Sequence, residues 1–197
     1  MWRTGPRACP SPAGPPGRFA ALARAISVVG HPFFLIPITV AAVTRSLFWS
    51  AVVAASTSVP LLAIIIRNVR RGAWSDVDVS RHDQRSGVYY AGFPLLLVTA
   101  ILLYLLGASA ELMRGIAAGA VMFAAGLAGN RFLKISMHMM FAAFCTVALV
   151  RGYPAAAFGA IPFVAAIAWS RHYLSRHTWP EIATGLVIGA LCGAAGS

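Results

Sequence analysis

The amino-acid sequence predicts an all-α fold: a polytopic membrane bundle of about six to seven transmembrane helices, with three polar stretches on one face. Its composition favours this fold class, because hydrophobic residues make up 59% of the chain and charged residues only 11%. The apolar residues are also gathered into runs that approach the length of a bilayer crossing. Such a composition excludes an ordinary soluble globule.

The beginning of the chain differs in composition from the rest. Residues 1–18 are rich in Pro, Gly and Arg, and they contain neither a continuous apolar core nor a small-residue cleavage pattern. We therefore expect a disordered basic tail at 1–18, and not a signal peptide, followed by a single membrane-embedded domain at 19–197.

Apolar runs predict the helices in order. The first is expected at 24–43 and contains His31 and Pro32, and we expect His31 to pack or to form a hydrogen bond. Pro60 is expected to kink the second helix, at 47–66. Further helices are expected at 88–106, 115–129, 138–150, 154–169 and 181–191. The runs at 138–150 and 154–169 are short for a bilayer, so their ends are expected to line a polar cavity.

Three polar stretches lie between these helices, at 72–87, 130–138 and 170–181. Two helices separate the first stretch from the second, and two more separate the second from the third. A chain that crosses the membrane twice returns to the side from which it started. All three stretches are therefore expected to converge on one face of the bundle.

The third stretch contains a histidine and a carboxylate at helical spacing. Glu181 follows His177 by four residues, and Pro180 favours the first turn of a helix. From that turn the carboxylate reaches back to the imidazole. A histidine held in this way has a defined tautomer, and its other nitrogen is available for nucleophilic or base chemistry.

Together the three stretches carry cations, a hydroxyl group and a second histidine. Clustered cations repel one another unless a multiply charged anion lies among them, and arginine binds phosphate through two hydrogen bonds. Phosphate is therefore the expected ligand. The residues are Arg81, Arg85, Lys134 and Arg171 as cations, Ser136 as hydroxyl donor, and His138 and His177 for attack or proton transfer.

The alternative is that these cations only set the membrane topology. That explanation suits Arg67, Arg70 and Arg71, but it accounts neither for histidines beside cations nor for a carboxylate four residues after one of them. We therefore favour a site. Whether Arg176 and His172 belong to the site stays open, since either side chain can also face lipid headgroups.

The third stretch resembles the type 2 phosphatidic acid phosphatase superfamily, the membrane lipid phosphatases related to vanadium haloperoxidases. The third motif of that family is Ser-Arg, five residues, His, three residues and Asp. The sequence has Ser170-Arg171, His177 and Glu181 at this spacing, with Glu in place of Asp.

The other two family motifs are matched in part. Of the second motif, Pro-Ser-Gly-His, the sequence keeps Ser136 and His138. The first motif, Lys, six residues and Arg-Pro, is absent as written, and its nearest equivalents are Arg81 and Arg85, with Lys134 in place of the missing lysine.

The resemblance implies a metal-independent lipid phosphatase without a cofactor. His177 would attack phosphorus to form a phosphohistidine, Glu181 would orient it, and His138 would protonate the leaving alcohol. The implied phosphate ligands are Arg85, Arg171 and Ser136, with Arg81 and Lys134 as additions.

The expected partners are a lipid phosphate and the bilayer. Phosphatidate, phosphatidylglycerophosphate, polyprenyl diphosphate and a polyprenyl phospho-sugar phosphate all place an apolar tail in lipid and a phosphate in water. Despite the net charge of +11, no basic stripe with interleaved aromatic residues indicates nucleic acid. Two alternatives remain: a catalytically inactive scaffold of the same fold, and a transporter of an anionic substrate, which would carry charges at helix centres.

Cations outside the candidate site indicate its side of the membrane. The positive-inside rule places the site in the cytoplasm, and we expect the inner (plasma) membrane of a bacterium. The cations on the site side are Arg3, Arg7, Arg18, Arg24, Arg67, Arg70, Arg71 and Arg131, against Arg45, Arg114 and Arg151 opposite.

The cysteines and glycines say less about the surroundings of the protein. Cys9, Cys145 and Cys192 have no paired spacing and do not indicate the compartment. Glycine-rich helices offer a face for a homo-oligomer.

Overall fold

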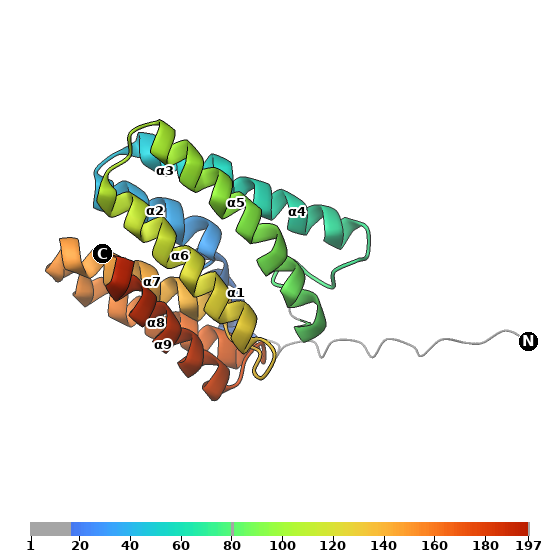
Figure 1. Cartoon of the computed structure of the whole chain (residues 1–197). Coiled ribbons are helices and arrows are strands. Elements are labelled where there is room, and N and C mark those ends of the chain that lie inside the picture. Colours follow the sequence, from blue (N-terminus) through green and yellow to red (C-terminus); the bar gives the residue numbers. More distant parts are fainter. Residues whose placement is uncertain (1–16, 80, 197) are drawn as a thin grey trace, which may run out of the picture.

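The computed structural model describes residues 17–79 and 81–196, and all regular structure in these residues is helical. The predicted all-α class is confirmed. Long helices run side by side, with α9 beside α6 and α7 (Figure 1). The elements are α1 (Arg18–Val29), α2 (Pro32–Thr44), α3 (Leu47–Val53), the π-helical turn η1 (Ala54–Ser58), α4 (Val59–Arg70), η2 (His82–Gln84), α5 (Arg85–Leu105), α6 (Ala110–Gly129), α7 (Met137–Gly152), η3 (Pro154–Ala156), α8 (Ala157–Tyr173) and α9 (Trp179–Gly196).

Five helical segments of the described chain are long and apolar enough to cross a membrane, and α1 with α2 forms a sixth if the bent pair counts as one span. This is the architecture of a helical membrane protein. α7 is apolar but has only 16 residues, as its short run predicted. The run at 154–169 was also expected to be short. That prediction is wrong, because the helical segment extends to Tyr173. The five segments are Leu47–Arg70, His82–Leu105, Ala110–Gly129, Pro154–Tyr173 and Trp179–Gly196.

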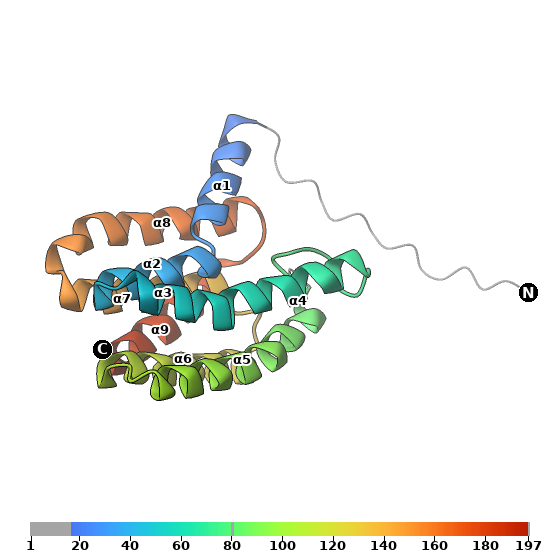
Figure 2. The ribbon, with the colours of Figure 1, turned by 90° about the horizontal axis from the view of Figure 1, so that it is seen from above.

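The first span is two helices, and the prediction of one continuous helix at 24–43 is wrong. Pro32 disfavours helical geometry at the preceding residue, and His31 is extended, with φ −70° and ψ 138°. His31 instead caps α2, because its Nδ1 accepts a hydrogen bond from the backbone N–H of Phe33. α1 is bent by 50° from α2 and packs beside the end of α8 (Figure 2).

Several other boundaries differ from the predictions. α6 begins at Ala110 because Ser109 caps it, so Glu111 and Arg114 lie in the helix and not in a turn. In the second span the π-helical turn η1 precedes Pro60, and the segment continues as one span. The tail predicted at 1–18 falls mostly outside the described residues, and Arg18 is already the first residue of α1.

A close contact between α7 and α9 positions the site. A Cβ atom at Gly185 would lie 2.6 Å from the carbonyl oxygen of Ser136, and one at Gly193 would lie 2.9 Å from that of Phe144. The glycine face of α9 is therefore a packing face within the chain, as predicted, and it sets the beginning of α9 beside the beginning of α7. A homo-oligomer stays a prediction, and it would have to use other surfaces than this face.

The opposite end of the bundle gathers the intervening turns. Arg45, after α2, donates to the Tyr153 hydroxyl at 2.8 Å. Arg151, at the end of α7, donates to the carbonyl oxygen of Ala194 in α9 at 2.7 Å. These turns lie away from the polar stretches, as the counting of crossings requires.

Candidate functional site

The three polar stretches meet at one end of the bundle. Arg85, the first residue of α5, donates to the carbonyl oxygen of Ile135 and lies 3.3 Å from His177. Lys134 donates from Nζ to the carbonyl oxygen of Arg176 at 2.7 Å. The predicted convergence of segments far apart in sequence is therefore confirmed.

The partners of His177 define its tautomer. Nδ1 lies 2.9 Å from Oε2 of Glu181, and Nε2 lies 3.3 Å from Nη2 of Arg85. A carboxylate accepts and a guanidinium donates, so the proton is on Nδ1 and the lone pair is on Nε2. Burial, followed by the charges of Arg85, Arg171 and Lys134, holds the pKa of His177 well below its ordinary value. The imidazole is therefore neutral.

Glu181 reaches His177 because its side chain turns back toward the residue that precedes α9. The backbone N–H of Thr178 donates to Oε2 of Glu181 at 3.1 Å, which is the bond that a glutamate in the third helical position makes with its N-cap residue. Pro180 lies in the same first turn, where its missing N–H is not needed. Glu in place of the family's Asp therefore still contacts the histidine.

Arg171 is held by residues that the sequence argument did not assign. Its side chain is buried, and Nη1 donates to Oγ of Ser27 at 2.7 Å and to Oδ2 of Asp78 at 2.8 Å. Burial alone would raise the pKa of the Asp78 carboxyl, but the Arg171 guanidinium holds that pKa below its ordinary value. Asp78 is thus a carboxylate paired with a buried cation.

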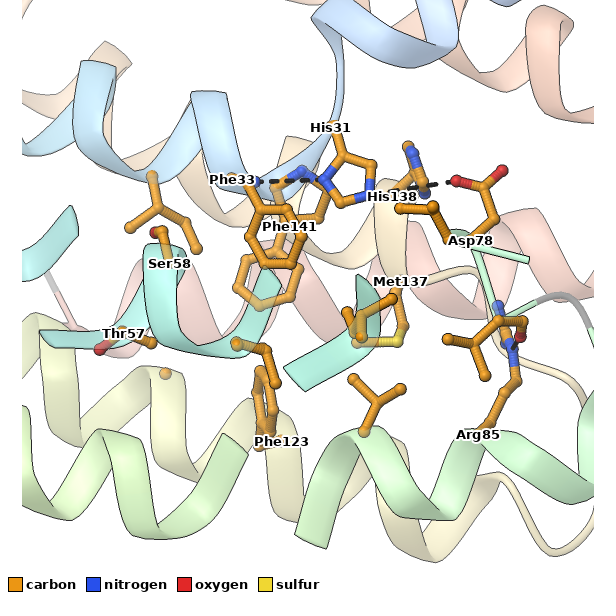
Figure 3. Close-up of a pocket in the computed structure, with 18 of the residues that line it drawn as sticks. His31, Phe33, Thr57, Ser58, Asp78, Arg85, Phe123, Met137, His138 and Phe141 are labelled. Carbon is orange, nitrogen blue, oxygen red and sulfur yellow. Dashed lines mark hydrogen bonds and ion pairs between the residues drawn. The ribbon is translucent and has the colours of Figure 1, made fainter. Parts of the chain in front are cut away.

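His138 lies beside a third histidine (Figure 3). The ring centroids of His31 and His138 are 4.8 Å apart in an edge-on arrangement, and Nε2 of His31 is 4.0 Å from Oδ1 of Asp78. His138 is the second residue of α7, and Ser136 is the residue that immediately precedes this helix. The interruption between α1 and α2, at Gly30 and His31, brings the third histidine to this place.

Buried polar atoms without a partner are concentrated in this region. Six such side-chain atoms occur in the described residues, and three of them are Oγ of Ser136, Nε2 of His138 and Nε of Arg171. Leaving buried hydrogen-bonding groups unpaired is costly, so each calls for an explanation such as a ligand. Ser136 and Arg171 can donate to an anion from these atoms, and so can His138 when Nε2 carries a proton.

One predicted phosphate ligand does not join the cluster. The Arg81 side chain is 62% exposed and forms two hydrogen bonds with the carboxylate of Asp83, at 3.0 and 3.2 Å. A surface carboxylate two residues away has already satisfied this guanidinium. Arg85, four residues later, is buried and supplies the cation of the first stretch.

The remaining predicted residues are brought together, namely His177, Glu181, Arg85, Lys134 and Arg171, with Ser136 and His138 alongside them. The pKa of Lys134 is lowered, first by burial and then by the charge of the nearby Arg85 guanidinium. Sequence reasoning missed Ser27, His31 and Asp78. The His31-Pro32 dipeptide was a signal for a helix break, and Asp78 was a carboxylate in a cationic loop.

The charge of the cluster favours an anion over a metal ion. His31, Asp78 and His138 each offer one atom of a metal-ligating type, and these atoms lie within 4.8 Å of one another. However, Asp78 is already bonded to the Arg171 guanidinium, and Arg85 stands on the same cavity wall. A divalent cation placed there would be repelled by both arginines.

Two hollows adjoin the cluster. An inner cavity of about 70 Å³ is lined by His31, Asp78, Arg85 and His138 together with apolar side chains (Figure 3). A more open groove of about 460 Å³ lies between α1 and α4, with Arg24 and Arg176 among its polar lining and Phe34 and Leu62 among its apolar lining. His31 and Asp78 line both hollows and so form part of the wall between them.

Comparisons of the chain with protein-family models, with curated proteins and with solved structures found no match. The family resemblance therefore stays a prediction, and the function has to be argued from the geometry of the site.

Proposed function

We propose that the protein is an integral-membrane phosphatase that hydrolyses a phosphomonoester or diphosphate of a lipid through a phosphohistidine on His177, without a metal. The observation that carries this proposal is the pair of contacts on His177: Glu181 at Nδ1 and Arg85 at Nε2. The lone pair of a buried, neutral imidazole is directed at a cation that would hold a phosphoryl group.

In the first step, Nε2 of His177 attacks phosphorus and the bond from phosphorus to the lipid oxygen breaks. His138, as an imidazolium, gives its proton to that oxygen, and the lipid alcohol leaves. Glu181 accepts a hydrogen bond from Nδ1–H of His177 and stabilises the positive charge on the phosphorylated ring. Arg85, Arg171 and Lys134 stabilise the negative charge on the phosphoryl oxygens.

In the second step, neutral His138 takes a proton from water as the hydroxide attacks phosphorus. The bond between phosphorus and Nε2 breaks, phosphate is released, and His177 returns to its neutral form. His138 ends the cycle protonated, so the two histidines need no outside proton donor.

The substrate class follows from the surroundings of the site. The inner cavity and the groove both combine cations with apolar walls, which suits a phosphate attached to a lipid tail. Phosphatidate, phosphatidylglycerophosphate, polyprenyl diphosphate and polyprenyl phospho-sugar phosphate share this chemistry. A site on the cytoplasmic side of a bacterial inner membrane would favour substrates made there.

Phosphate release from a panel of these lipids tests the proposal. Purified wild type is expected to release phosphate in the presence of a chelator, and His177→Ala is expected to release none. The matched control is His82→Ala, because that histidine is exposed and its ring contacts the backbone of Asn130, not a residue of the proposed site.

Two outcomes would contradict the proposal. A His177→Ala protein as active as wild type would exclude the phosphohistidine. Folded wild type that is inactive on the whole panel would favour the inactive scaffold, and uptake of an anionic substrate into vesicles without hydrolysis would favour the transporter.

A further inference from the structure

Asp78 and His31 have no part in the two chemical steps above, yet they lie against the proposed acid. Asp78 comes from the loop after α4, and His31 comes from the break between α1 and α2. Both side chains border the inner cavity into which His138 faces (Figure 3). Their arrangement indicates a role in controlling the proton on His138.

The Asp78 carboxylate lies between two groups. Oδ2 accepts from Arg171 at 2.8 Å, and Oδ1 faces Nε2 of His31 at 4.0 Å. His31 cannot rotate freely, because its Nδ1 accepts from the backbone N–H of Phe33 at 3.4 Å as the N-cap of α2. The proton of His31 is therefore on Nε2, the nitrogen that faces Asp78.

His138 is in a place that opposes its acid form. A general acid has to be protonated when the leaving group departs, but the His138 residue is only 5% exposed, and the Arg171 charge lies close to it. Both factors disfavour the imidazolium. The charged and titratable groups that face His138 are Arg171, Asp78, His31 and His177, with Arg85 on the wall of the same cavity.

Asp78 supplies the negative charge in this set. Glu181, the other carboxylate of the site, is engaged with His177. The side chain of Asp78 is 23% exposed, and it also lines the open groove, so it remains ionised more readily than a fully enclosed carboxylate. A phosphate bound in the site would add further negative charge near His138.

We propose that Asp78 is the counter-ion that keeps His138 protonated in the enzyme–substrate complex, and that His31 holds Asp78 in place for this task. Both are positioning residues, and the inference rests on the proposed phosphatase function. Asp78 stays ionised throughout and transfers no proton. His138 gives its proton to the leaving oxygen and regains one from the attacking water.

The test compares a poor with a good leaving group. A lipid alkyl phosphate needs the acid, whereas p-nitrophenyl phosphate has a leaving group that departs without protonation. The pH profile of kcat reports the groups of the enzyme–substrate complex. For wild type on the alkyl phosphate, the fall at high pH is expected at or above about 6.5, the ordinary value for histidine.

Asp78→Asn removes the charge and keeps the shape of the side chain. Loss of an opposite charge as close as Asp78 is to His138 lowers the pKa of a histidine by about 1–3 units. The fall in kcat is therefore expected to move to lower pH by that amount. At a pH above both values, alkyl phosphate hydrolysis then drops roughly 10- to 1,000-fold. Hydrolysis of p-nitrophenyl phosphate is expected to drop much less.

The control is Glu111→Gln, the same chemical change at an exposed carboxylate in the first turn of α6, at the opposite end of the bundle. Its profile is expected to match wild type. An equal loss on both substrates in Asp78→Asn, with no movement along the pH axis, would show that Asp78 only holds Arg171. A wild-type profile that already falls below pH 5 would also overturn the inference.

His31 provides a second pair of variants if Asp78→Asn does not fold because Arg171 is left unpaired. His31→Leu removes the N–H that faces Asp78, and His31→Gln keeps a donor. The expected result is a selective loss on the alkyl phosphate in His31→Leu that His31→Gln largely restores. Identical behaviour of the two variants on both substrates would refute the role of His31. Inactive wild type would instead refute the proposed function.

Discussion

Oε2 of Glu181 lies 2.9 Å from Nδ1 of His177, and this one oxygen also accepts the backbone N–H of Thr178 at 3.1 Å. The carboxylate that fixes the tautomer of the histidine therefore also caps α9. Orientation of the proposed nucleophile and formation of the helix start depend on the same atom.

Glu181→Gln is expected to lower kcat by roughly 10²–10⁴-fold, as in other enzymes where an amide replaces a histidine-orienting carboxylate. The amide can present its NH₂ group to Nδ1, which favours the tautomer with the proton on Nε2 and removes the lone pair. Initial rates of phosphate release check this, with Glu111→Gln as the control. A wild-type rate in Glu181→Gln would mean that Glu181 only caps the helix.

The stability of the protein is expected to fall as the pH drops below about 6.5, the value of histidine in an unfolded chain. The pKa of folded His177 is lowered by burial and then by Arg85, so the unfolded state binds the extra proton. His177 therefore contributes its full stability above about pH 6.5 and loses it as the pH falls toward the folded value.

Asp78 acts in a separate window. Its folded pKa is below the ordinary value, so its contribution is complete above about pH 4 and is lost only under more acidic conditions. Thermal unfolding in detergent between about pH 4.5 and 8 therefore measures how histidine protonation changes the stability, without a contribution from Asp78. His177→Gln is expected to reduce the slope by up to about 1.4 kcal/mol per pH unit. An unchanged slope would contradict the assignment.

Gly189→Ala is expected to destabilise the protein by about 1–3 kcal/mol, because the added methyl group meets the backbone of Met140 where α9 crosses α7. Gly115→Ala in α6 is the matched control. No atom lies within 4 Å of its Cβ position, so alanine is expected to be neutral or to stabilise the helix by about 0.5–1 kcal/mol. Thermal unfolding of the two variants checks the difference, and equal values would contradict the close approach.

A cysteine at Ser75, in the exposed loop after α4, is expected to react with membrane-impermeant reagents only from the cytoplasmic side. Cys9 has to be replaced by Ser first, and an introduced cysteine at Arg114, near the opposite end, serves as the reciprocal control. Labelling of Ser75→Cys only from outside would place the proposed site on the outer face.

The sequence was sufficient for contacts that depend on short spacing or on counting. His177 and Glu181 are four residues apart at a proline-marked helix start, so local geometry alone brings them together. The meeting of Arg85, Lys134 and His177 followed from the number of crossings, because each crossing reverses the side of the membrane.

Other features depended on packing that spacing does not reveal. His31 reaches His138 only because the chain bends by 50° at Gly30 and His31, and hydropathy runs smoothly through that bend. Asp78 reaches Arg171 through the folding of an irregular loop. The sequence made Arg85 an implied ligand and Arg81 an addition, but it did not reveal that Arg81 lies at the surface, where it pairs with Asp83.

The bond between Thr178 and Glu181 also ties the orientation of His177 to the formation of α9. Arg85 and Lys134 precede α9 in the chain, so the cationic half of the site is synthesised and inserted first. His177 gains its orientation only when the first turn of α9 winds up and that helix docks its glycine face on α7. Until α9 docks on α7, the proposed nucleophile would therefore lack the carboxylate that sets its tautomer.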